Sequence, residues 1–164
     1  MVGRWRGLLV LGSMVGAFAA AAPGTAQTKK IGTFGGWAIS LLDDKGRFVS
    51  CVADTTGTDN EGLRLSFGED GRRHFILPGP ATSGARDEAI VVLQPSGKRF
   101  TFPLAQRSTD RLWSPVLEND FTDVFFASKR MEVRLPARNV TRSFDLGDPD
   151  TMSARIDGCV ASRQ

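Results

Sequence analysis

The alternation of apolar and polar residues decides the fold class, and its clearest example is Met131-Glu132-Val133-Arg134-Leu135. Residues 63–67 and 99–102 follow the same pattern. Successive side chains of a strand point to opposite faces, so a period of two is typical of half-buried strands in an antiparallel sheet. We therefore expect a mainly β protein, built as an antiparallel β-sandwich.

Further strand candidates extend this pattern along the chain. They are residues 37–42, 48–53, 73–77 and 112–117. Residues 89–93 read Ala-Ile-Val-Val-Leu, and this uninterrupted aliphatic run predicts a central strand that is covered on both faces. Residues 43–46, 69–71 and 95–97 predict hairpin tips, because each stretch ends in a glycine that can take a positive φ.

Two short helices are expected in the second half of the chain. Phe121, Val124 and Phe125 have the i, i+3, i+4 spacing of one helix face, and Asn119 or Asp120 would be the N-cap.

The second helix is expected to start after Asp148, whose carboxylate would cap it. Pro149 then takes the first helical position, where its missing N–H costs nothing. We expect this helix to end just before Gly158, since glycine is the residue that most often terminates a helix.

Residues 1–26 have the composition of a secretory signal peptide. Arg4 and Arg6 supply a positively charged start, and residues 7–22 are apolar or small. Small residues before position 27 predict cleavage after Ala26 and a periplasmic or secreted protein. The alternative is an N-terminal membrane anchor, which the glycine and serine residues within the apolar run disfavour.

Residues 27–164 are expected to form one domain, since a chain of this length can bury a core without help from a metal or a partner. Loss of residues 1–26 would leave 19 basic and 18 acidic residues, interspersed along the chain. Nucleic-acid binders cluster their basic residues, so we expect no nucleic-acid partner. The densest basic pairs, Lys29-Lys30 and Arg72-Arg73, are expected to be solvated strand ends or turns.

Cys51 and Cys159 are the two cysteines of the chain, and secretion favours a disulfide between them. The loop between them is long, and closing it would stabilise the fold by roughly 4 to 5 kcal/mol. A reactive or metal-binding pair is the alternative. Zinc sites need four ligands and His74 is the single histidine, so we expect no metal site.

The sequence contains no complete catalytic set. His74 follows a hairpin tip on a predicted strand, and no serine lies in a glycine-flanked nucleophile elbow. No phosphate-binding glycine loop or dinucleotide fingerprint is present, so we expect no cofactor. Acidic pairs at residues 43–44 and 148–150 are explained by a turn and by a helix cap. We therefore expect that the protein is not an enzyme.

The order of these features resembles the invasion-associated locus B family of secreted alphaproteobacterial proteins. The resemblance covers Phe34-Gly35-Gly36-Trp37, the strand to Cys51, the helix at Phe121, and Phe144-Asp145-Leu146-Gly147 before the last helix and Cys159. Family members often have a further cysteine soon after the tryptophan, where this chain has residues 38–41 without one. The resemblance implies a periplasmic or exported β-sandwich that is linked to host-cell invasion in some members, and it implies no catalytic residue.

The leading functional hypothesis is a non-catalytic periplasmic or exported binding protein with a protein or glycan partner. Arg72, Arg73 and Trp113 are the candidate surface residues for that partner. One alternative is an inhibitor of an extracellular lysozyme or protease, with residues 78–84 as the inserted loop. An envelope hydrolase is a third possibility, and it would need two acids facing one cleft.

Overall fold

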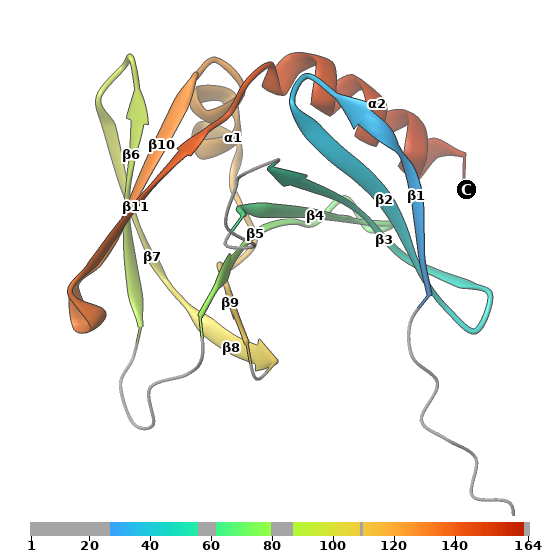
Figure 1. Ribbon diagram of the computed structural model, residues 1–164, viewed down its shortest axis with the longest axis horizontal. Coiled ribbons are helices and arrows are strands. Elements are labelled where there is room, and N and C mark those ends of the chain that lie inside the picture. The colour runs from blue at the N-terminus through green and yellow to red at the C-terminus, as the bar shows by residue number, and fades with distance from the viewer. Residues whose placement is uncertain (1–26, 56–61, 80–86, 109, 163–164) are drawn as a thin grey trace, which may run out of the picture.

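The computed structural model describes residues 27–55, 62–79, 87–108 and 110–162. Two antiparallel sheets pack together, and two helices lie beside them (Figure 1). This arrangement confirms the predicted β-sandwich with two short helices. The predicted signal peptide, residues 1–26, lies outside the described residues. No helix within the described ranges has the length and apolar character needed to cross a bilayer.

The larger sheet has seven strands in the order β1-β2-β3-β4-β5-β9-β8. Its strands are β1 (Gln27–Phe34), β2 (Trp37–Asp44), β3 (Arg47–Thr55), β4 (Arg64–Gly68), β5 (Arg73–Pro78), β8 (Ala105–Ser108) and β9 (Arg111–Trp113). The smaller sheet has four strands in the order β11-β10-β6-β7. Its strands are β6 (Glu88–Gln94), β7 (Lys98–Pro103), β10 (Arg130–Leu135) and β11 (Val140–Asp145). The remaining elements are α1 (Asn119–Phe126), a 3₁₀ turn (Pro136–Arg138) and α2 (Pro149–Ala161).

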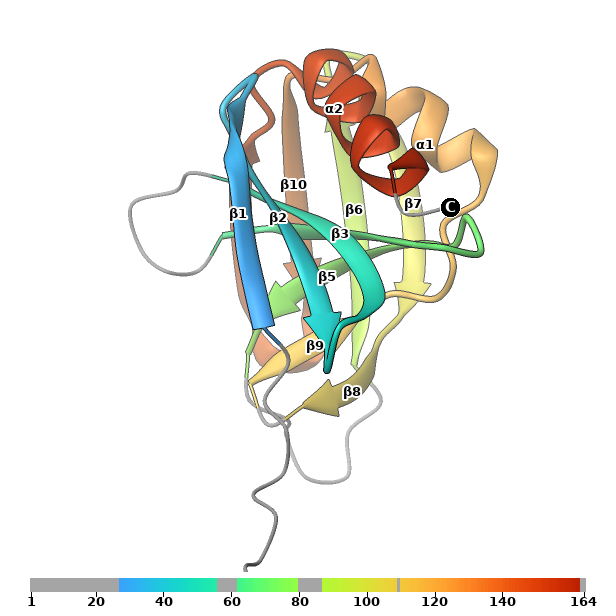
Figure 2. The same ribbon diagram turned by 90° about the vertical axis from the view of Figure 1, so that its right-hand side faces the viewer.

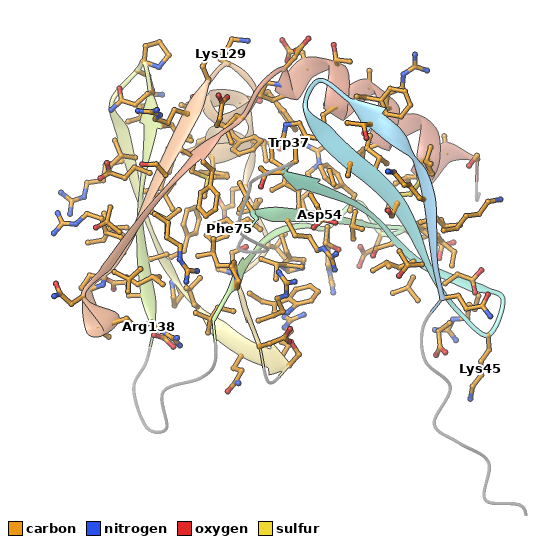
Figure 3. The ribbon with its side chains drawn as sticks, viewed as in Figure 1. Trp37, Lys45, Asp54, Phe75, Lys129 and Arg138 are labelled. Atoms are coloured by element: carbon orange, nitrogen blue, oxygen red, sulfur yellow. A yellow bond between two sulfur atoms is a disulfide. The ribbon has the colours of Figure 1, made fainter. Side chains whose placement is uncertain are left out.

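Aromatic rings fill the space between the two sheets and α1. The ring centroid of Phe75 on β5 lies 5.2 Å from that of Phe102 on β7. Phe121 of α1 lies 5.1 Å from Phe102 and 5.8 Å from Phe125, and Phe125 in turn lies 6.2 Å from Trp37. Figure 3 shows Trp37 and Phe75 inside the molecule, where both are buried. The predicted apolar face of α1 is therefore confirmed, and it closes one end of the core.

The predicted N-cap of α1 is wrong. Asn119 is the first helical residue, and the N-cap is Glu118, whose side chain makes no capping hydrogen bond. Phe121 and Thr122 in the first turn are both buried. The start of this helix is therefore set by packing rather than by a side-chain cap.

Strand β6 is central in its sheet, between β10 and β7, but it is not covered on both faces as the sequence predicts. Ala89, Val91 and Leu93 are fully buried, whereas Ile90 and Val92 are half-buried. Within the described residues, no second layer covers the outer face of the four-stranded sheet (Figure 1). Ile90 and Val92 therefore fit the outer face because β-branched residues favour strands, and not because that face is buried.

Three strands, β1, β8 and β11, are absent from the sequence-based prediction, and all three lie at sheet edges.

A fourth difference concerns residues 112–117, where the strand ends at Trp113. Pro115 has no N–H and so cannot donate a backbone hydrogen bond to β5. The Phe75 N–H of β5 donates instead to the Ser114 hydroxyl, over 3.0 Å. The three predicted hairpin tips are confirmed, with positive φ at Gly46, Gly71 and Gly97.

The predicted start of α2 is confirmed, but its predicted end is wrong. The Asp148 carboxylate accepts a hydrogen bond of 3.2 Å from the Thr151 N–H, and Pro149 occupies the first turn. The helix then continues through Gly158 instead of ending there. Cys159 is buried just beyond Gly158, and this tertiary contact keeps the last turn helical.

Three contacts fix α2 on the larger sheet. The predicted disulfide is confirmed and joins Cys51 of β3 to Cys159 of α2. Before the helix, the Trp37 indole Nε1 donates a hydrogen bond of 2.7 Å to the carbonyl of Leu146. The Asp148 N–H donates one of 2.8 Å to the carbonyl of Gly35 in the turn between β1 and β2. Both ends of α2 are therefore attached to the same sheet.

A buried ion pair joins the loop before β6 to the 3₁₀ turn. The Arg138 guanidinium donates two hydrogen bonds of 2.8 Å to the Asp87 carboxylate, one from Nε and one from Nη2. The side chains of Arg138 and Asp87 are only 11% and 6% exposed. Such a pair need not add much stability, but removing one partner leaves a buried charge uncompensated.

We expect Asp87→Asn to lower the free energy of unfolding by about 3 to 5 kcal/mol at neutral pH, because Arg138 loses its carboxylate partner. Urea denaturation measures the change. Glu88→Gln is the control, since Glu88 is the exposed acidic neighbour. A loss no larger than that of the control would contradict this account of the pair.

The same pair predicts a pH dependence. Hydrogen bonding from Arg138 holds the pKa of the Asp87 carboxyl below its usual value of 3.8. A carboxyl whose pKa is lower in the folded state stabilises the fold above the unfolded pKa, and this contribution is lost as the pH falls through the folded pKa. The stability difference between the native protein and Asp87→Asn should therefore persist down to about pH 4 and shrink in more acidic urea titrations.

We expect Gly158→Ala to raise the free energy of unfolding by about 0.5 to 1 kcal/mol, because glycine is a poor residue inside a helix. A Cβ at this position would meet nothing within 4 Å, so no clash offsets the gain. Thermal unfolding of the oxidised protein measures the effect. A lower unfolding temperature would show that the last turn of α2 needs glycine for another reason.

Candidate functional site

A groove of about 530 Å³ lies between β1 and α2. Helix α2 packs against β1, β2 and β3 at one end of the larger sheet (Figure 2). The groove is lined by Lys29, Lys30, Ile31 and Phe34 from β1, and by Arg155 and Gly158 from α2. We call this surface the β1–α2 groove.

A β-bulge in β1 shapes one wall of this groove. Lys30 pairs with Ser40 and Gly32 pairs with Ile39, so Ile31 is the extra residue. The Ile31 side chain at this bulge is 47% exposed, so it is accessible at the wall of the groove. Lys29 is paired with Leu41, so the two side chains lie on the same face of the sheet. This is the face that α2 covers.

Phe34 and Arg155 connect the two walls. The Arg155 guanidinium carbon lies 4.9 Å from the centroid of the half-buried Phe34 ring, within the range of a cation–π contact. Gly32 makes room for this ring, since a Cβ there would come within 2.8 Å of Phe34. The aromatic ring and the guanidinium therefore have a defined place in the groove.

The charge of the groove has one sign. Lys29, Lys30 and Arg155 line it, and no carboxylate of the described residues does. Within the described residues, none of these three cations forms a salt bridge. A cluster of this kind attracts anionic groups, because the positive potentials of neighbouring charges add.

The floor of the groove is apolar and held in place. Leu41 and Cys159 form it, and both are buried. Cys159 is bonded to Cys51 on β3, so the disulfide fixes the distance between α2 and the sheet. The groove is therefore a preformed feature of the fold, and a ligand would not have to order its walls.

A second hollow, of about 750 Å³, lies where the β2–β3 and β4–β5 hairpins approach each other. Its lining mixes charges of both signs: Lys45 and Arg47 are accompanied by Asp44, Glu69 and Asp70. Because these charges compensate one another, the hollow has no clear preference for an anionic or a cationic ligand. The β1–α2 groove is the stronger candidate for that reason.

The structure does not bring the three predicted surface residues together. Arg72 is exposed in the β4–β5 turn and forms an ion pair of 3.1 Å with Asp70. Arg73 is half-buried, with its guanidinium carbon 5.7 Å from the ring centroid of Phe67. Trp113 is also half-buried, and Arg107 lies over its ring at 5.4 Å. The three residues therefore occupy three separate environments.

Sequence reasoning noticed the Lys29-Lys30 pair of the groove but not its connection to Arg155 and Phe34. Arg155 lies near the other end of the chain, and only the position of α2 on the sheet brings it to β1. The available signal was a pair of lysines beside an exposed isoleucine, which also fits a solvated strand end.

The residues considered for catalysis have structural partners. His74 Nδ1 lies 3.0 Å from the carbonyl of Ser114, and its ring packs edge-on against Trp113. Asp43 accepts a hydrogen bond of 2.7 Å from the Gly46 N–H in its turn. Hydrogen bonds from Thr151 lower the pKa of the Asp148 carboxyl, as befits a helix cap. No group of three potential metal ligands occurs among the described residues.

The predicted inhibitory loop, residues 78–84, lies largely outside the described residues, which include only Pro78 and Gly79 of it. Gly79 donates a backbone hydrogen bond of 2.9 Å to the carbonyl of Asp110. In comparisons with known proteins, the chain matches no family model, no curated protein and no solved structure.

Proposed function

We propose that this chain is a non-catalytic binding protein that acts outside the cytoplasm, and that the β1–α2 groove is its ligand-binding surface. The observation that carries this proposal is that Lys29, Lys30 and Arg155 line a groove with an apolar floor, and that no acidic side chain of the described residues lines it. Lys29 and Arg155 lie on the α2 side of the sheet and Lys30 starts from the opposite face at the rim, so positive potential is concentrated along the edge of β1 and favours an anionic ligand. The ligand is therefore a protein or glycan that presents negative charge.

Three further observations support export. The Cys51–Cys159 disulfide suits an oxidising compartment. Residues 1–26 have the pattern of a signal peptide. The resemblance to the invasion-associated locus B family adds a role in contact with host cells. In that setting a rigid basic groove would bind acidic groups at a cell or envelope surface.

We expect Arg155→Glu to weaken ligand capture about tenfold, because it removes the cation over Phe34 and places a carboxylate beside the lysines. The oxidised protein is immobilised, exposed to envelope extract and to a host-cell surface fraction, and its bound partners are identified by mass spectrometry. Each exposed ion pair contributes about 0.2 to 1 kcal/mol, and reversing the charge both removes an attraction and adds a repulsion of similar size, so the sum of up to about 2 kcal/mol brackets a tenfold loss of affinity.

Arg134→Glu is the matched control, since Arg134 is exposed on β10 of the other sheet. It makes the same change in net charge away from the groove. Partners that are retained by the native protein and by Arg134→Glu, and depleted with Arg155→Glu, would support the proposal. Equal retention by all three proteins would contradict it.

A further inference from the structure

Strand β1 has a free edge beside the groove. It is the first strand of the seven-stranded sheet and pairs with β2 on one side. No strand of the described chain lies on its other side (Figure 2). In an antiparallel strand, alternate N–H and C=O groups point away from the paired neighbour, so the outer groups of β1 are available to a further strand.

The other sheet edges are less suited to receive a strand. β1 has eight residues, whereas β8 has four and β7 and β11 have six each. β7 also ends in a proline, which cannot donate a hydrogen bond. β1 is therefore the longest of the four edge strands within the described residues, and it borders the β1–α2 groove.

The charge of β1 decides which strand can pair with it. Antiparallel pairing of β1 with β1 of a second copy would bring the two Lys29-Lys30 pairs close together, and like charges across strands are destabilising. An acidic strand has the opposite effect, since its carboxylates meet Lys29 on the α2 side and Lys30 on the other side. Arg155 adds a second positive charge on the α2 side.

We propose that the edge of β1 and the β1–α2 groove together bind an extended acidic segment of a partner protein, which joins the larger sheet as an additional strand. This inference rests on the proposed function of the groove and specifies its ligand. Backbone hydrogen bonds to β1 supply much of the affinity, and two adjacent acidic residues supply the specificity. An apolar residue next to them packs on the exposed Ile31 side chain at the bulge.

The probe is a fluorescent eight-residue peptide in which two adjacent glutamates are flanked by alternating valine and threonine. A peptide with lysines in place of the glutamates is the charge control. Fluorescence anisotropy with the oxidised protein should show binding of the acidic peptide alone. Hydrogen exchange should show new protection of the amides of residues 27–34 when that peptide is present. Absence of binding by the acidic peptide, or equal binding of both, would overturn the inference.

N-methylation of the probe tests strand pairing directly. Alternate N–H groups of an added strand point toward β1. Methylating one alternate set should therefore abolish binding, while methylating the other set should leave it nearly unchanged. Equal effects of the two sets would overturn the added strand. If Arg155→Glu still weakened the capture of natural ligands about tenfold in that case, the proposed function would stand without this inference.

Gly158→Leu tests the groove without a change of charge. Gly158 lines the groove and has open space around its Cα, so leucine fills the groove while the helix gains a better helix former. We expect about tenfold weaker peptide binding, and Gly158→Ala is the smaller matched variant. Unchanged binding by a folded Gly158→Leu protein would overturn the role of the groove.

Two other occupants of the same edge would also overturn the assignment. One is a second copy of the chain, seen as a dimer in sedimentation without peptide that buries β1. The other is an anionic glycan whose binding excludes the peptide.

Discussion

The disulfide between Cys51 and Cys159 is the constraint on which the β1–α2 groove depends. It connects β3, an interior strand of the larger sheet, to the last turn of α2, 108 residues later. Without it, α2 would be held on the sheet by the Trp37 and Asp148 hydrogen bonds at its start and by the packing of its buried face. The bridge fixes the far end of the helix, which is the end that borders the groove. In this protein, one covalent bond therefore stabilises the fold and sets the width of the groove that we propose as the binding surface.

The same anchoring explains why residues from distant parts of the chain meet in one place. The hydrogen bond from Trp37 to Leu146 closes the core and positions the start of α2 beside the turn between β1 and β2. The helix axis then places Arg155 over Phe34. Neither residue is part of the buried core, but both owe their position to core contacts. The groove is thus a consequence of how the C-terminal segment packs onto the N-terminal hairpin.

The sequence predicts the interior of this fold better than its margins. Alternation at residues 131–135 and the spacing of Phe121 and Phe125 identify a strand and a helix correctly, because burial imposes those patterns. The sequence pattern does not predict β1, β8 and β11, because these strands lie at sheet edges and bury few side chains. The end of α2 was misplaced because a buried cysteine overrides the usual effect of Gly158. Local sequence patterns cannot report such a tertiary contact.

The candidate site lies where the sequence signal is weakest, and the reason is physical. A free edge strand needs protection from pairing with copies of itself, and lysines together with a bulge are common means of protection. Lys29, Lys30 and the bulge at Ile31 therefore fit a purely protective role when β1 is considered alone. The protection is selective, however, because positive charge repels another β1 and attracts an acidic strand. Arg155 and the apolar floor, which lie outside β1, add to this selection and have no part in protecting the edge. Their presence favours recognition of an acidic partner over protection alone.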